Sequence, residues 1–516
     1  MGQAHTPLSA TDVGVPQRAR RILMAVPPIV ALCVALWHGP YLIDDAYITF
    51  RYAENLAAGR GMVFNPHEPV LGTTTPLFAV LLGAVRWLGL EIPSAARVIG
   101  LASAMGIVLI TQRLAARFVG PVAALAAGLC LALHPELAFT ANSGMETGLS
   151  MVAVYATLLL ALEGRYLGAG LAGGLAFLLR PDGALAAILA IGLAGWRAPR
   201  RIWKPLLAAL LIASPWLIYA LLTYGSAVPQ SIQAKQLLHP DSPFHILQVN
   251  LARLTFGFGM KALCGLALVG LAAAGARRCG LLLVGVWLLT YLAGLSATRI
   301  VSLFPWYITP LLPALVLLAV YGVSEIGGAL AGTFARSAGK RKPAAEWAAA
   351  LSLLVLGGVF LSGRATWRTQ IYDPLFGQRV QAYLRIADLL RSRCAAGDVV
   401  LVGEVGALAY ALPEQVIVDT SGINSREVFL ARQADQQRRG NPGRRGPAVE
   451  DSPALVIELV DRFKPRYIVT YWPWLHIREI MQVPRIRSTY RFVRLDMPSA
   501  KEYVVLERRE RSETRP

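Results

Sequence analysis

The chain has 516 residues, of which 55% are hydrophobic and 16% charged, and its formal net charge is +19. This composition excludes an ordinary soluble globular protein, because long apolar runs recur from Ile22 to about Gly363. The basic residues bracket these runs instead of forming one stripe. They therefore argue against nucleic acid as a partner and favour a polytopic membrane protein with positively charged cytoplasmic loops.

The chain begins with residues 1–20, predicted to be a disordered cytoplasmic tail, followed by a transmembrane domain over 21–363. With the basic loops placed inside, about eleven transmembrane helices are expected. They are predicted at 22–38, 98–113, 120–138, 147–162, 166–179, 184–196, 205–222, 257–275, 280–296, 309–325 and 346–363. The apolar segment 76–90 breaks the parity of this topology. Either it is a re-entrant or interfacial helix, or the Gly-rich segment 166–179 does not cross.

The first external loop, residues 39–97, carries the most informative motif of the chain. Two adjacent carboxylates, Asp44 and Asp45, stand at a membrane–water boundary, with Tyr47 and Arg51 just behind them. A charge near hydrocarbon costs a few kcal/mol unless it is paired or faces water. A helix cap needs only one Asp. The pair therefore predicts a membrane-embedded active site with Asp44 and Asp45 as its catalytic carboxylates.

Four further external segments hold polar or aromatic groups that are unusual at this depth. They supply the candidate substrate-binding residues Glu146, Arg180, Gln230, Lys235, Arg299, Trp306 and Tyr307, to which Tyr47 and Arg51 are added. The expected topology puts all of them on the side of Asp44 and Asp45. A cavity with carboxylates, cations and aromatic faces suits a phosphate-linked sugar donor and a hydroxyl acceptor.

In such a transfer a carboxylate takes the proton of the acceptor hydroxyl, typically contributing ~10²–10⁴ in rate. Arg and Lys stabilise the charge on the departing phosphate, and Trp and Tyr offer flat surfaces to sugar rings. The second carboxylate either orients the first or holds a divalent cation (Mg, Mn or Ca). Two acids without a third ligand are weak evidence for a metal.

Each candidate also has a structural interpretation. Glu146 is favoured at a helix N-terminus by the dipole, and Arg180 is able to snorkel to the interface. Asp182 is a good turn residue in "RPDG". Lys235 is compatible with a solvated loop, and the aromatic pair at 306–307 with an interfacial aromatic belt.

After Arg364 the pattern changes. Apolar runs shorten to strand length at 398–403, 415–420, 465–472 and 502–508, with helical patterns at 378–391 and 453–463. This alternation predicts a compact α/β domain over 364–516 on the external side. The Arg- and Gly-rich segment 432–451 is predicted to be a mobile basic loop within it.

The motif "DDAYITFRYAENLAAGRGMVFNP" (44–66) resembles the first-loop signature of a family of C-type (GT-C) membrane glycosyltransferases. It is most similar to that of the mycobacterial terminal β-(1→2) arabinofuranosyltransferases and their bacterial relatives. "SGMET" (143–147), "RPDG" (180–183) and "YGSAVPQSIQAK" (224–235) follow in the family's order. The tail, with "VIVDTSGINS" (416–425), looks like the family's periplasmic C-terminal domain.

The resemblance implies a multi-pass protein of the bacterial inner membrane whose active site faces the periplasm. It implies inverting transfer from a polyprenyl monophosphate donor, such as decaprenyl-phosphate arabinose, to a cell-envelope glycan or glycolipid. The general base falls on Asp44 or Asp45, with Asp44 slightly favoured, and Arg180 and Lys235 become phosphate or acceptor contacts. Departures at 70–78 and Gln230 leave the sugar open.

Three other readings remain. A protein mannosyltransferase or a lipid A aminosugar transferase shares the superfamily fold. A transporter or lipid flippase is a different class, but it should show internal symmetry and ionisable residues near the membrane midplane, whereas here the notable charges gather at one interface. An inactive scaffold that binds glycan through its tail is the third.

Overall fold

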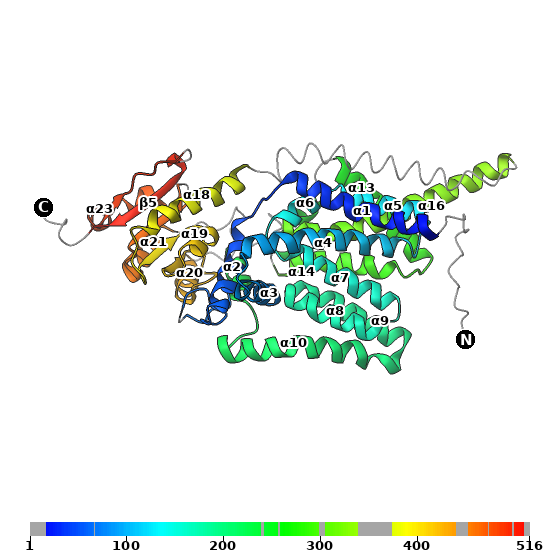
Figure 1. The fold of residues 1–516 in the computed structure, drawn as a ribbon, viewed down its shortest axis with the longest axis horizontal. Helices are drawn as coiled ribbons and strands as arrows, with labels where there is room; N and C mark the ends of the chain where they lie inside the picture. Colours follow the sequence, from blue (N-terminus) through cyan, green and yellow to red (C-terminus); the bar gives the residue numbers. More distant parts are fainter. Residues whose placement is uncertain are drawn as a thin grey trace.

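The computed structural model describes residues 17–66, 68–238, 242–255, 258–298, 305–338, 374–439, 452–472, 474–497 and 500–509. Long helices form one part of the molecule, and the C-terminal strands and helices form the other (Figure 1). The predicted cytoplasmic tail falls largely outside the described residues, as do Arg299 and the predicted span 346–363.

The helical part follows the apolar runs of the sequence. Its helices are α1 (Gln17–His38), α4 (Ile92–Ala115), α5 (Pro121–Ala132), α6 (Pro135–Asn142), α7 (Thr147–Leu162), α8 (Tyr166–Leu179), α9 (Ala184–Arg197), α10 (Trp203–Tyr224), α13 (Phe258–Ala276), α14 (Leu282–Ala297) and α16 (Leu312–Ala338). A helix therefore stands at ten of the eleven predicted segments, and the eleventh is 346–363.

Length separates these helices into two groups. Within the described residues, four are long and apolar enough to cross a membrane, namely Ile92–Ala115, Pro199–Tyr224, Gly259–Ala276 and Pro305–Leu330. The pair α5 and α6, bent by 55°, makes a fifth if it is one span. Helices such as α8 have 14 residues and reach about 21 Å, against a hydrocarbon core of about 30 Å. Helix length thus supports four or five crossings directly.

The segment that broke the predicted parity is a short helix. The helix α3 (Pro76–Trp87) has 12 residues, or about 18 Å, which is too short to span a bilayer. It packs against α2 (Asp44–Ala57), the helix of the first external loop. Its length fits the predicted interfacial or re-entrant helix, and the 14 residues of α8 also fit the other explanation, that 166–179 does not cross.

The C-terminal part is built on a five-stranded sheet in the order β2-β1-β3-β5-β4. The strands are β1 (Val399–Val402), β2 (Val416–Asp419), β3 (Tyr467–Tyr471), β4 (Tyr490–Phe492) and β5 (Tyr503–Arg508). The first three run parallel, and β5 and β4 are antiparallel to their neighbours. Strands stand at all four segments predicted from the sequence; β4, only three residues long, gives too little pattern to be found.

Helices cover this sheet and connect its strands. They are α18 (Pro374–Arg391), α19 (Gly406–Ala411), α20 (Arg426–Arg438), α21 (Pro453–Phe463), α22 (Ile477–Ile480) and α23 (Pro484–Thr489). The helices expected at 378–391 and 453–463 are α18 and α21. The predicted mobile loop 432–451 is wrong in its first part, because residues 432–438 continue α20 and Arg432 donates a hydrogen bond to the Thr420 carbonyl. Residues 440–451 lie outside the described chain.

The first loop connects the two parts through a side chain that bonds to the backbone of β2, as a neighbouring strand would. The Asn65 side chain accepts a hydrogen bond from the Ile417 N–H (3.0 Å) and donates one to its carbonyl (2.9 Å). It therefore satisfies the edge strand β2, whose backbone would otherwise be exposed. The predicted substrate contact Gln230 has a similar function, since its side chain donates to the carbonyls of Gly422 (2.8 Å) and Ser425 (3.1 Å).

Arg51 holds the end of α19. Its side chain is buried, and it donates to the carbonyls of Phe64 (2.7 Å), Leu412 (2.9 Å) and Gln415 (2.9 Å) and to that of Ala409. The carbonyls of Ala409 and Leu412 lie at and just beyond the C-terminus of α19, where a helix leaves carbonyls without internal donors. Gln415 directly precedes β2, and Phe64 belongs to the first loop itself. The prediction that Arg51 binds substrate is therefore not supported by its position, which gives it a role in docking the C-terminal domain.

Replacing Arg51 with Met should loosen this junction. The change leaves several buried carbonyl oxygens without donors, at ~1–3 kcal/mol each, so we expect the protein to lose on the order of 3 kcal/mol of stability. Thermal unfolding of the purified protein in lipid nanodiscs measures this loss. The exposed Arg60, changed to Met in the same way, should leave the melting temperature nearly unchanged. Equal melting temperatures for both variants would contradict the docking role.

Candidate active site

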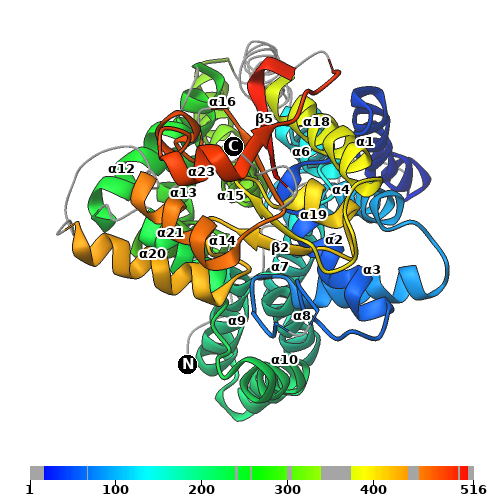
Figure 2. The ribbon, with the colours of Figure 1, turned by 90° about the vertical axis from the view of Figure 1, so that its left-hand side faces the viewer.

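A cavity of about 590 Å³ lies where the helical part meets the C-terminal domain. Its volume is within the ~300–1,000 Å³ of pockets that bind small molecules. It is lined from α2, from the loop at 72–75, from the segments around Glu146 and Arg180, from α11 (Gln230–Leu238), α14 and α15 (Pro305–Ile308), and from loops that follow β1, β2 and β3. Figure 2 views this end of the molecule, with α2 beside α19.

The cavity brings together most of the residues singled out in the sequence. Asp44, Asp45, Glu146, Arg180, Lys235, Trp306 and Tyr307 line it. Tyr47, Arg51 and Gln230 do not, and Arg299 lies outside the described residues. Tyr47 is buried instead against the rings of Phe50 and Tyr410, so its position indicates packing and not substrate contact.

Asp44 is bound to the backbone of the C-terminal domain. Its two carboxylate oxygens accept hydrogen bonds from the N–H groups of Gly406 (2.8 Å) and Ala407 (2.7 Å), at the start of α19. A Cβ at position 406 would stand 1.9 Å from the Asp44 carbonyl oxygen, so only glycine permits this approach. Burial raises the pKa of Asp44 to about 6 although these N–H groups lower it, and the nearby Asp45 charge raises it further.

The Asp45 side chain points in a different direction from that of Asp44. One residue further along α2 is a rotation of about 100°, and the Asp45 side chain is less buried than that of Asp44 and lines the cavity. No hydrogen bond or ion pair to its carboxylate is found within the described part of the chain. The two carboxylates that look equivalent in the sequence thus have different surroundings.

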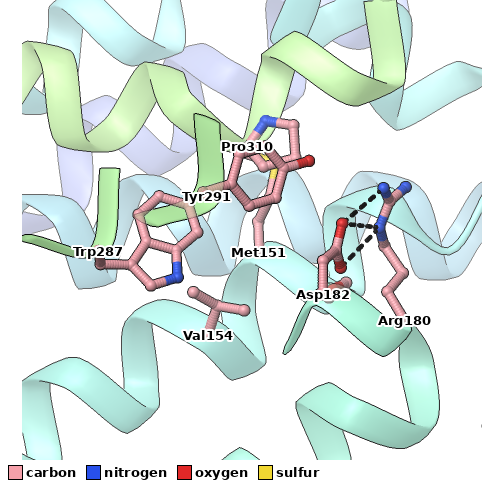
Figure 3. A pocket seen from close by; sticks show the side chains of 8 residues that line it. Met151, Val154, Arg180, Asp182, Trp287, Tyr291 and Pro310 are labelled. Atoms are coloured by element: carbon pink, nitrogen blue, oxygen red, sulfur yellow. Dashed lines mark hydrogen bonds and ion pairs between the residues drawn. The ribbon is translucent and has the colours of Figure 1, made fainter. Parts of the chain in front are cut away.

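Arg180 is neutralised by two carboxylates. Its guanidinium forms ion pairs with Asp182 (2.8 Å) and Glu146 (3.4 Å). The Asp182 carboxylate faces the guanidinium in Figure 3, from the short turn η1 (Pro181–Gly183). Asp182 therefore is a turn residue, as predicted, and also a partner for Arg180. Neither Glu146 nor Arg180 is merely a surface charge.

Lys235 is the cation with the least compensation among the described lining residues. Its ammonium donates to the Tyr307 hydroxyl (3.1 Å) and stands 5.7 Å from the centroid of that ring. The hydroxyl of Tyr291 in turn donates to the Tyr307 carbonyl (3.1 Å). Burial lowers the pKa of Lys235, but Tyr307 and Asp45 outweigh this effect and raise it above its ordinary value. Lys235 therefore remains charged.

Several residues that line the cavity were not identified from the sequence. They are Thr73, Thr75, Tyr291, Glu404, Asp419 and Trp474. The Asp419 carboxylate has a structural role, since it accepts hydrogen bonds from the N–H groups of residues 421, 423 and 424. Glu404 and Trp474 reach the cavity only because the C-terminal sheet docks there, and no local motif marks them.

The carboxylates do not form an evident metal site. No group of three or more His, Cys, Asp and Glu side chains arranged to hold a metal is found within the described residues. Both oxygens of Asp44, one of the two expected ligands, already accept backbone N–H groups. The donor set around Asp44 and Asp45 therefore does not fit a divalent cation.

Comparisons with known proteins agree with the fold. Residues 369–512 match a family described as a domain of unknown function, DUF8728. No curated protein matches the sequence. The crystal structure of ArnT from Cupriavidus metallidurans bound to undecaprenyl phosphate superposes with a TM-score of 0.59 at 16% identity, over 95% of this chain and 98% of that one. Its apo state gives 0.57 at 16% identity, over 94% and 97%.

A third structure extends the comparison. The Archaeoglobus fulgidus oligosaccharyltransferase tethered with an acceptor peptide has a TM-score of 0.53 at 11% identity, over 88% of this chain and 69% of that one. At such identities the likeness concerns the fold. The chain has the fold of the GT-C membrane glycosyltransferases, which confirms that expectation from the sequence.

Asp44 should make stability depend on pH. Its pKa is raised from 3.8 to about 6, so between these values the folded chain holds a proton that the unfolded chain has lost. The contribution to stability is full below about pH 4 and is lost as the pH rises through 6, by about 3 kcal/mol. The melting-temperature difference between wild type and Asp44→Asn, which cannot titrate, should therefore shift against the wild type from pH 4 to 7.5. A constant difference would contradict the buried carboxylate.

Proposed function

We propose that the protein is an inverting glycosyltransferase that uses a polyprenyl monophosphate sugar as donor and a hydroxyl of a cell-envelope glycan or glycolipid as acceptor. The observation that supports this most is one cavity that contains both Asp45, whose carboxylate has no hydrogen-bond or ion-pair partner among the described residues, and a charged ammonium, Lys235. The fold shared with ArnT, whose crystal structure holds undecaprenyl phosphate, supports the class of donor.

Asp45 is the general base in this proposal. Its carboxylate takes the proton of the acceptor hydroxyl as the acceptor oxygen attacks the anomeric carbon of the donor sugar. The bond from that carbon to the phosphate oxygen breaks, and the configuration inverts. This proton transfer is worth ~10²–10⁴ in rate. Asp44, which the sequence slightly favoured as base, instead fixes the position of α2 because both of its oxygens are already bonded.

Lys235 stabilises the leaving phosphate. Negative charge grows on the phosphate oxygens as the bond to the sugar breaks, and a fixed ammonium in a partly buried site stabilises that charge more than one in water. Arg180 is less available for this function because Glu146 and Asp182 already neutralise it. Arg180 instead keeps Tyr307 and Lys235 in place, since its guanidinium stands 5.7 Å from the centroid of the Tyr307 ring.

The cavity also has an apolar side that suits a lipid. Leu185, Ile232 and Leu295 line it next to the polar groups. A prenyl chain leaving the phosphate would meet these side chains. We further propose, from the resemblance in the first loop, that the cavity opens to the periplasmic side of a bacterial inner membrane. The donor sugar in this proposal is arabinofuranose or another pentose or hexose, and a panel of donors decides among them.

Purified protein in nanodiscs, given a panel of polyprenyl-phosphate pentoses and hexoses together with a cell-envelope glycan extract as acceptor, tests this proposal. We expect the wild type to release free polyprenyl phosphate from one donor. Asp45→Asn should lower that rate by ~10² or more, and Lys235→Met should lower it by about tenfold or more because the leaving phosphate loses its cation.

Matched controls separate chemistry from folding. Asp44→Asn should change stability at least as much as Asp45→Asn does, with a smaller loss of rate per folded molecule. Lys204→Met removes a partly exposed lysine outside the cavity and should keep full activity. Turnover that survives Asp45→Asn but disappears in folded Asp44→Asn would return the base to Asp44. Turnover that survives both would overturn the first-loop base.

A further inference from the structure

The wall of the cavity that comes from the C-terminal domain has no part in the reaction described so far. Glu404 follows β1, Ser421 follows β2, and Trp474 follows β3 by three residues, and all three line the cavity. These strands are parallel neighbours in the sheet. Their carboxyl ends therefore meet at one edge, which is where open α/β sheets bind ligands.

Glu404 brings an unused polar atom to this edge. Its side chain is 15% exposed, and its Oε2 is buried without a hydrogen-bond partner within the described residues. The closest cation is Arg379, at 3.8 Å. A buried acceptor that lacks a donor costs ~1–3 kcal/mol, so a ligand that supplies the missing hydrogen bond would recover this energy.

The charge state of Glu404 suits a hydroxyl. Burial raises the pKa of Glu404 well above its ordinary value, and the charges of Asp44 and Asp45 raise it further, against the opposing effect of Arg379. A protonated carboxyl both donates and accepts hydrogen bonds. It therefore matches a hydroxyl group, which does the same, better than it matches an anion.

Trp474 places a rigid aromatic ring beside this carboxyl. The Arg379 guanidinium contacts the rings of both Trp474 (5.4 Å to the centroid) and Tyr471 (5.2 Å), and these two rings meet edge to face at 5.7 Å. At Gly403 a Cβ would stand 2.6 Å from the Thr470 hydroxyl oxygen and 3.5 Å from the Trp474 ring. The ring is thus fixed in the wall of the cavity before any ligand arrives.

We propose that Glu404 and Trp474 form a subsite for a sugar ring of the acceptor. The Trp474 ring packs against the apolar C–H face of the sugar, and the Glu404 carboxyl bonds to one of its hydroxyls. This inference rests on the proposed function and narrows it, because it makes the acceptor a carbohydrate that is bound by the C-terminal domain.

The backbone fixes the position of this subsite relative to the proposed base, Asp45. Glu404 precedes by two residues the Gly406 N–H that binds Asp44, and Asp44 is adjacent to Asp45. The carboxyl that binds the acceptor and the carboxylate that takes its proton are therefore connected through one short path of backbone and two hydrogen bonds. An acceptor ring bound on Trp474 would therefore face Asp45 without a conformational change of the protein.

Saturation-transfer NMR on the full chain in nanodiscs free of glycoside detergent tests the subsite. The probes are methyl α-D-arabinofuranoside, methyl α-D-mannopyranoside and methyl β-D-glucopyranoside. We expect at least one to bind the wild type, and to bind about tenfold more weakly in Glu404→Leu and Trp474→Leu. The control variants Glu427→Leu, an exposed residue, and Trp472→Leu, which is outside the cavity lining, should bind as the wild type does.

Trp474→Phe keeps a flat ring and should retain part of the binding, which guards against a folding defect in Trp474→Leu. No binding of any probe to the wild type, or equal binding by Glu404→Leu and wild type, overturns the subsite. The donor assay distinguishes the two proposals. Glycoside binding that depends on Trp474 without turnover of any donor would retain the subsite and reject the glycosyltransferase. Sugar transfer from a donor, with unchanged glycoside binding in both variants, would retain the glycosyltransferase and reject the subsite.

Discussion

The docking of α19 on α2 is the interaction on which the site depends. Asp44 accepts the N–H groups at the start of α19, and Arg51 donates to the carbonyls at its end. Asp44 and Arg51 are seven residues apart, about two helical turns or 10.5 Å, and the six residues of α19 span about 9 Å. A negative charge at the N-terminus and a positive charge at the C-terminus both favour the helix dipole. Two charged side chains on one face of α2 thereby hold the C-terminal domain.

This arrangement explains why two adjacent carboxylates are present. One of them, Asp44, is used to join the domains, and its neighbour Asp45 is thereby fixed at the wall of the cavity. The cations are divided in the same way. Arg51 and Arg180 are satisfied by carbonyls and carboxylates respectively, which leaves Lys235 as the cation best able to meet a phosphate. In both sets, some charged residues stabilise the structure and another residue of the same charge remains available for the reaction.

The sequence predicted those features that local pattern determines. Apolar runs located the membrane helices, and short alternating runs located four strands of the sheet. The segments around Glu146, Arg180, Lys235 and Tyr307 were expected on one side, and they line one cavity. Local pattern does not reveal which polar group meets which backbone. The partners of Asp44 and Arg51 are N–H and carbonyl groups more than 350 positions away, so Arg51 looked like a substrate contact and Asp44 like the base. For the same reason Glu404 and Trp474 gave no signal.

The most direct test of this account is a cryo-EM structure of the full chain in nanodiscs with undecaprenyl phosphate added. We predict density for the phosphate in the cavity between α2 and α11, within hydrogen-bonding distance of the Lys235 ammonium, with Asp44 still bound to the N–H groups of Gly406 and Ala407. Phosphate bound outside this cavity, or an Asp44 carboxylate released from α19 to contact the lipid, would contradict it.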